Sequence, residues 1–266
     1  MNRIAYILSA LLLTILTASC EKELDFEYHD VDSPLVIEAS LSQNGSSVSI
    51  TRTVAMDEPM DPEPVTAATV RLTDGTDGTS RILTLRADGT FGDEVPGVPG
   101  HTYSVDVDHQ GTVYCSTCAM RTPTEIVSME FSWIKMPYDE VAVLQVSFRA
   151  DPSDPDDCYW VRLLRNGEAY QWMVIDGHNA ADGVINAVTM TTRKTIEEEE
   201  DKDLLLDGDE VTALVTPISR DMSDYLTALS ADSNGPAMWS GGFCLGYFLA
   251  APVAERTIVF HPDLIE

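Results

Sequence analysis

The chain is poor in basic residues. It has 16 Lys and Arg against 44 Asp and Glu in 266 residues, and its formal net charge is −28. A surface of that charge repels phosphate backbones, which argues against nucleic acid as a partner. Apolar residues still make up 44% of the chain, so the composition is globular rather than disordered.

The chain also lacks the short motifs of common catalytic sites. It contains no nucleophile elbow, zincin motif or phosphate-binding loop, and its five histidines have no partners at metal-ligand spacing. Carboxylates are abundant, but no pair among them stands out for glycoside hydrolysis. We therefore predict a protein without enzymatic activity, with an extracellular hydrolase as the weaker alternative.

The N-terminus has the pattern of a lipoprotein signal peptide. Arg3 precedes an apolar run over residues 4–16, and small residues then lead to Cys20. The run is too short to span about 30 Å of hydrocarbon as a permanent helix. A cysteine at the cleavage point is typical of a bacterial lipoprotein, in which the thiol is acylated. We predict a signal peptide over residues 1–19 and a lipid anchor on Cys20; ordinary secretion is the alternative.

The remainder divides into an acidic tether and two β-rich domains. Residues 20–33 are polar and acidic, and they predict the tether. Short alternating runs separated by turn residues predict an immunoglobulin-like or transthyretin-like β-sandwich over residues 34–122. Thr122-Pro123 marks the boundary, and residues 123–266 predict a second β-rich domain. The fold class is therefore mainly β.

Local signals also predict individual elements. Asn44-Gly45 and Asn166-Gly167 each predict a β-hairpin. Residues 219–230 predict one short helix, because Ser219 is a suitable N-cap and an apolar stripe follows it. Residues 243–250 predict a closing strand of the second domain.

The chain has four cysteines beyond Cys20. An exported protein can oxidise them, and four cysteines allow three pairings, among which the sequence does not choose. The preferred bridge joins Cys158 and Cys244, which both lie in the second half. Cys115 and Cys118 have the spacing of half a redox or zinc motif. They lie within a predicted strand, so that their side chains point to opposite faces, and no second pair completes a metal site.

One acidic loop has the composition of a weak calcium site. Its carboxylates are those of Asp151, Asp154, Asp156 and Asp157. Extracellular modules bind Ca²⁺ weakly through such loops, but the spacing matches no EF-hand. A solvated turn is the favoured interpretation, so that we predict no cofactor beyond a weakly held Ca²⁺ and no firm metal site.

Aromatic residues gather around the second hairpin and near the C-terminus. Exposed aromatic side chains stack on sugars or become buried at protein interfaces. The candidates for an interface are Trp160, Trp172, Trp239 and Tyr247. Packing in the core is the simpler interpretation for most of them.

Six blocks in this order resemble a known family over almost the whole chain that follows the leader. They are Cys20–Glu23, Leu35–Glu38, Val65–Val70, Asp88–Phe91, Pro99–Tyr103 and Gly241–Phe248. Together they resemble the Bacteroidota lipoprotein family called domain of unknown function 4249. The middle blocks also resemble carboxypeptidase-regulatory-like or transthyretin-like sandwiches.

The resemblance implies an outer-membrane lipoprotein, often associated with TonB-dependent transporters, and it brings no established activity. Glu21 and Glu23 after the lipidated cysteine are similar to signals for export to the cell surface, which we favour over the periplasmic face. The expected function is a binding or accessory component of a nutrient uptake system. A structural or adhesive surface module is the alternative.

Overall fold

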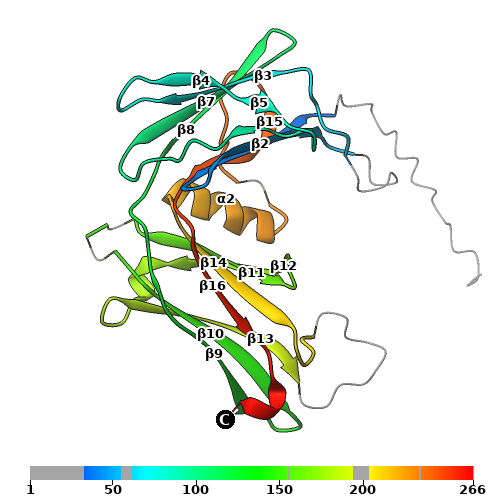
Figure 1. The fold of residues 1–266 in the computed structure, drawn as a ribbon, viewed down its shortest axis with the longest axis vertical. Helices are drawn as coiled ribbons and strands as arrows, with labels where there is room; N and C mark the ends of the chain where they lie inside the picture. The colour runs from blue at the N-terminus through cyan, green and yellow to red at the C-terminus, as the bar shows by residue number, and fades with distance from the viewer. Residues whose placement is uncertain are drawn as a thin grey trace, which may run out of the picture. The chain divides into compact units, whose positions relative to one another are not determined.

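The computed structural model describes residues 33–54, 62–151, 153–154, 156–193, 204–233 and 235–265. The predicted signal peptide, Cys20 and nearly all of the predicted tether lie outside these residues. The segment from Ser33 onward forms one compact unit (Figure 1). No helix among the described residues is long and apolar enough to cross a bilayer.

The first sandwich consists of two sheets. One has the order β15-β1-β2-β6-β5 and the other β4-β3-β7-β8. The strands are β1 (Leu35–Ser42), β2 (Gly45–Arg52), β3 (Thr69–Asp74), β4 (Ser80–Ile82), β5 (Thr84–Leu85), β6 (Phe91–Asp93), β7 (Thr102–His109), β8 (Thr112–Ala119) and β15 (Cys244–Ala250).

The second sandwich also consists of two sheets, with the orders β13-β10-β9 and β12-β11-β14-β16. Its strands are β9 (Ile126–Lys135), β10 (Glu140–Arg149), β11 (Cys158–Arg165), β12 (Glu168–Asp176), β13 (Val184–Arg193), β14 (Glu210–Ile218) and β16 (Ala254–Val259). The helix α2 (Arg220–Ser230) follows β14, and single 3-10 turns occupy Gly177–Asn179 and Pro262–Leu264.

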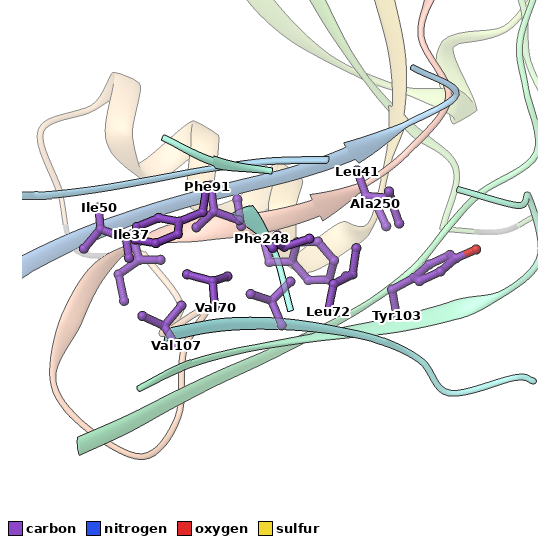
Figure 2. Close-up of a cluster of buried hydrophobic side chains, with 14 of the residues drawn as sticks. Ile37, Leu41, Ile50, Val70, Leu72, Phe91, Tyr103, Val107, Phe248 and Ala250 are labelled. Atoms are coloured by element: carbon purple, nitrogen blue, oxygen red, sulfur yellow. The ribbon is translucent and has the colours of Figure 1, made fainter. Parts of the chain in front are cut away.

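Strict alternation of apolar residues produces the core of the first sandwich. Ile37 on β1 and Phe248 on β15 point toward Val70 on β3 and Val107 on β7 (Figure 2). Successive strand residues face opposite sides of a sheet, so that the alternation noted in the sequence becomes one buried face and one outer face. Residues from sheets β13-β10-β9 and β12-β11-β14-β16 fill the second core in the same way.

The predicted local elements are confirmed. Asn166 and Gly167 have φ angles of 52° and 86° between β11 and β12, which is the geometry of a tight hairpin turn. The first hairpin joins β1 to β2. The helix begins after Ser219, whose side chain accepts a hydrogen bond from the Met222 N–H.

The predicted division at residue 122 needs a correction. Strand β15 does not close the second domain; it pairs in parallel with β1, and Cys244 lies opposite Leu35. Trp239, just before it, lies in the first core as well. The sequence pattern identified a strand here but could not identify its partner, because the pattern records only which face of a strand is buried.

Candidate functional site

The two sandwiches meet at a small apolar junction built around α2. Met222 and Leu226 of the helix pack there with Cys158 of β11, Ile218 of β14 and Leu249 of β15. Since β15 is hydrogen-bonded into the first sandwich and β11 into the second, this cluster joins the two. The junction positions the polar and aromatic groups described next.

An open cleft of about 770 Å³ lies beside this junction. Its walls come from the segment that links the sandwiches, from the acidic loop after β10, from the start of α2 and from β15. Arg121 of the linking segment forms an ion pair with Asp154 of the loop. The cleft is therefore lined by groups that hydrogen-bond and carry charge.

Asp157 is the most buried carboxylate of this cleft, with 5% of its surface exposed. It accepts hydrogen bonds from the Asp151 N–H and the Tyr159 hydroxyl, both at 2.8 Å. Burial raises the pKa of Asp157, and the same desolvation raises the pKa of Tyr159. Asp157 therefore takes up a proton more readily in the folded chain than a free carboxyl does.

The four carboxylates of the predicted calcium loop do not converge on one point. Asp151 accepts from the Ser153 N–H, Asp154 binds Arg121, and Asp157 faces Tyr159. The side chain of Asp156 is exposed, and no set of three or more ligand residues within the described ranges is placed to hold a metal ion. Three of these carboxylates instead bind groups of the chain itself, so that the arrangement does not support the predicted calcium site.

A cluster of aromatic side chains lies on the outer faces of β11 and β15. The Trp160 ring makes edge contacts with Trp172 at 6.4 Å and with Tyr247 at 6.1 Å between centroids. Tyr225 of α2 lies 5.9 Å from Tyr247. The structure thus brings together three of the four predicted interface aromatics and adds Tyr225, which we call the aromatic cluster.

Arg162 lies against the aromatic cluster and was missed by the sequence analysis. Its guanidinium carbon is 4.4 Å from the centre of the Trp160 ring, at cation–π distance. One of its amino groups reaches the Thr216 hydroxyl at 3.4 Å, and burial lowers the pKa of Arg162. Arg162 is two residues from Trp160 on one strand, which places both on the same face; this spacing is the signal that could have identified it.

Two buried donors at this place have no hydrogen-bond partner among the described residues. They are the indole N–H of Trp160 and the Nε–H of Arg162. Buried donors are nearly always satisfied in folded proteins, because an unmade hydrogen bond costs about 1–3 kcal/mol. Such exceptions mark a site that deserves a functional explanation.

Glu38 and Tyr247 complete this surface. Glu38 is opposite Tyr247 in the parallel pairing of β1 with β15. Burial raises the pKa of Tyr247 to about 12, with a contribution from the charge of Glu38, and Arg162 acts in the opposite direction. Partial desolvation also raises the pKa of Glu38. Charges of opposite sign, on Arg162 and Glu38, therefore act on the hydroxyl of Tyr247.

Trp239 was predicted as an interface residue, and this prediction is wrong. Only 7% of its surface is exposed, and its indole N–H donates to the Ile37 carbonyl at 3.2 Å. It fills the first core beside β15. Core packing was the simpler interpretation for most of these aromatics, and the chain beside Trp239 folds back onto β8 through Ser240 and Cys115.

The predicted bridge between Cys158 and Cys244 is not formed; the four cysteines of the described residues are free thiols. Cys158 is buried against α2, whereas Cys244 is in β15 at the edge of the first sandwich. Cys118 uses its sulfur as an acceptor for the Ala250 N–H at 3.3 Å. The prediction failed because it assumed that β15 belongs to the second sandwich.

The described histidines are engaged with other groups. His101, His178 and His261 each contact an aspartate, and His109 contacts the Ala67 carbonyl. Within the part of the chain that the structure describes, none of these hydrogen bonds joins a histidine to a serine or cysteine nucleophile. The hydrolase alternative gains no support from this arrangement.

The described residues thus define a mainly β protein whose two sandwiches pack against each other around α2, at a polar and aromatic junction. The chain belongs to the family described as Domain of unknown function (DUF4249), whose model matches residues 21–237. This confirms the family resemblance noted in the sequence.

A two fibronectin type-III domain segment from chicken tenascin is a similar solved structure. It is 12% identical, the match covers 86% of this chain and 100% of that one, and the TM-score is 0.26. No curated protein matches the chain.

Proposed function

We propose that this protein is an outer-membrane lipoprotein that serves as a non-enzymatic binding component of a TonB-dependent nutrient uptake system. A lipid on Cys20 holds the protein at the membrane, with the folded part at the cell surface. The junction of the two sandwiches binds a ligand or a partner protein. The N-terminal sequence supports the anchor, since an acylated cysteine after a short apolar leader binds the bilayer without crossing it.

The observation that carries the binding role is the aromatic cluster with Arg162. Trp172 is 40% exposed and lies opposite Arg162 across the β11–β12 pairing. Tryptophan, tyrosine and arginine are the residue types enriched at binding hot spots, and this cluster contains all three. The cluster lies where the two sandwiches meet, so that a bound ligand or partner contacts both.

The anchor is tested by mass spectrometry of the native protein and by fractionation of a Cys20→Ala variant. We expect the wild type to begin at an acylated Cys20 and to fractionate with membranes, and the variant to lose both properties. Cys115→Ser is the matched control and should remain in the membrane fraction. A native polypeptide that begins elsewhere, or bears an unmodified thiol at Cys20, contradicts the proposal.

The partner is tested by crosslinking in intact outer membranes, followed by purification of the full-length protein. We expect a TonB-dependent transporter among the crosslinked proteins, and its yield should fall in Trp172→Ala. Tyr138→Ala is the control, because Tyr138 is fully exposed at the tip of the β9–β10 hairpin and is not part of the aromatic cluster. Recovery of the protein without any transporter counts against an accessory role in uptake.

A further inference from the structure

Arg162 differs from several arginines of this acidic chain in having no acidic partner in the ranges that the structure describes. Arg81, Arg121, Arg165 and Arg220 each form an ion pair with an aspartate. Arg162 is desolvated, yet no carboxylate pairs with it among the described residues, and its one side-chain hydrogen bond is the long contact to Thr216. A half-buried guanidinium without a counter-charge is costly, so that a ligand of negative charge would relieve it.

Aromatic surfaces surround this guanidinium. Trp160 lies against it, Trp172 lies opposite it on β12, and the hydroxyl of Tyr247 is within its electrostatic reach. The planar fork of an arginine binds a carboxylate through two parallel hydrogen bonds, and a half-exposed indole contacts the flat or apolar part of the same molecule. The arrangement thus offers one anionic and one apolar contact at adjacent positions.

We propose that the aromatic cluster and Arg162 form a binding site for a small organic carboxylate that carries a flat or aromatic group. The carboxylate binds the free N–H groups of Arg162, and the apolar part rests on Trp172. This inference rests on the proposed binding role but does not require the lipid anchor or a transporter.

The charges around the site restrict the ligand to one acidic group. Glu38 of β1 is paired with Tyr247 of β15. On the other side, Arg162 is paired with Leu214 of β14, and Leu214 is paired with Glu255 of β16, so that Glu255 is two strands away from Arg162 in the same register. With a formal net charge of −28 on the whole chain, a polyanion is repelled over most of its length. A single carboxylate requires one local positive charge, which Arg162 provides.

The test is a titration of the full-length protein, in a neutral detergent, with N-acetylphenylalanine and with its amide. The two probes differ in the carboxylate alone, and tryptophan fluorescence reports binding beside Trp160 and Trp172. We expect the acid to bind saturably and the amide to bind at least about 10-fold more weakly, since hydrogen bonds to charged groups are the stronger ones.

Three variants separate this site from general effects. Arg162→Gln should weaken binding of the acid about 10-fold or more, and Arg162→Lys should retain part of it. Glu38→Gln should strengthen binding, because it removes a nearby negative charge. Arg71→Gln is the matched control, since Arg71 lies on β3 of the first sandwich and contacts Ser80; it should bind as the wild type does.

The proposal is overturned if neither probe binds the wild type, if the amide binds as tightly as the acid, or if Arg162→Gln retains full affinity. Equal binding of both probes would indicate a site for neutral stacking ligands such as sugars. Near-ultraviolet circular dichroism of each variant verifies that it is folded. A failed titration would not contradict the results on the anchor and on the crosslinked partner. A failure of those experiments would equally leave the titration result valid, so that the two proposals can fail separately.

Discussion

Gly246 is the residue at which β15 closely approaches the backbone of β1. Its φ is +96°, and a Cβ at this position would lie 2.1 Å from the Ile37 carbonyl oxygen. Both the backbone angle and the close approach of β1 require glycine. We expect Gly246→Ala to lower the free energy of unfolding by about 3 kcal/mol or more, since backbone atoms must move. Urea denaturation followed by tryptophan fluorescence measures it.

Gly167 provides a matched control for that substitution. It also has positive φ, at +86°, but nothing lies within 4 Å of an added Cβ. Gly167→Ala should therefore cost about 1–2 kcal/mol from backbone strain alone. If the two alanine variants were equally stable, the close contact between β15 and β1 would be contradicted.

Asp157 makes stability depend on pH in a direction opposite to that of a typical acid. Its pKa is raised by burial, so that the folded chain holds its proton to a higher pH than the unfolded chain. This group's contribution to stability is thus largest at low pH and falls as the pH rises from about 4, where an unfolded aspartate titrates, through the raised folded pKa. Asp157→Asn retains an oxygen that accepts from Tyr159. As the pH rises through this range, the stability of the variant should therefore increase relative to that of the wild type.

The measurement is a series of urea denaturations from acid to neutral pH. Asp156→Asn is the control, because Asp156 is exposed in the same loop and the substitution changes the charge equally. The difference in the free energy of unfolding between Asp156→Asn and the wild type should change little with pH. An Asp157→Asn variant that became less stable than the wild type as the pH rose would show that the ionised carboxylate is favoured.

At the level of elements, the sequence was sufficient to predict features that depend only on neighbouring residues, such as a hairpin turn and a helix cap. Asn166-Gly167 adopts the positive φ angles that a two-residue hairpin requires, and Ser219 caps α2 as its position predicted. These features depend on neighbours within a few residues. Aromatic position was harder to predict, because an alternating pattern assigns Trp160 to a face of β11 without saying what that face meets.

The N-cap of α2 gives a quantitative prediction at this level. Ser219 satisfies the Met222 N–H at 3.2 Å, and the helix carries Met222 and Leu226 into the junction. We expect Ser219→Ala to lower the free energy of unfolding by about 1 kcal/mol, because the N–H loses its partner. Chemical denaturation measures the change.

Ser230 at the far end of the same helix is the control. Its hydroxyl donates to the Thr227 carbonyl and is exposed, so that Ser230→Ala should change stability by less than about 0.5 kcal/mol. An equal effect at both positions would mean that the loss at Ser219 reflects serine removal in general rather than the cap.

For the whole molecule, the alternating runs and the turn residues between them predicted the mainly β class, and the family match agrees with the resemblance. The assignment of β15 failed because its partner β1 lies about two hundred residues away, and no local pattern encodes that pairing. One further error followed from it, the Cys158–Cys244 bridge, since both cysteines were assigned to the second sandwich. The site was predicted in part, since its aromatics were named and Arg162 was not.

The position of β15, between the first core and the junction around α2, predicts that the two sandwiches unfold together. Trp239 and Phe248 belong to the first core although they follow the strands of the second, and α2 packs on Leu249 between them. If the second sandwich unfolds, the ends of β15 are freed and the first core loses both side chains. Native-state hydrogen exchange should therefore give core amides of β7 and β11 the same highest free energy of opening.

Gly246→Ala makes this prediction discriminating. If the sandwiches form one cooperative unit, loosening β15 lowers the protection of β7 and β11 by equal amounts, although β11 is not paired with β15. If they are independent, protection falls in β7 alone and β11 keeps its wild-type value. Exchange measured by mass spectrometry on the full-length variant separates these outcomes, and an unchanged β11 would mean that the junction around α2 carries too little energy to couple the two sandwiches.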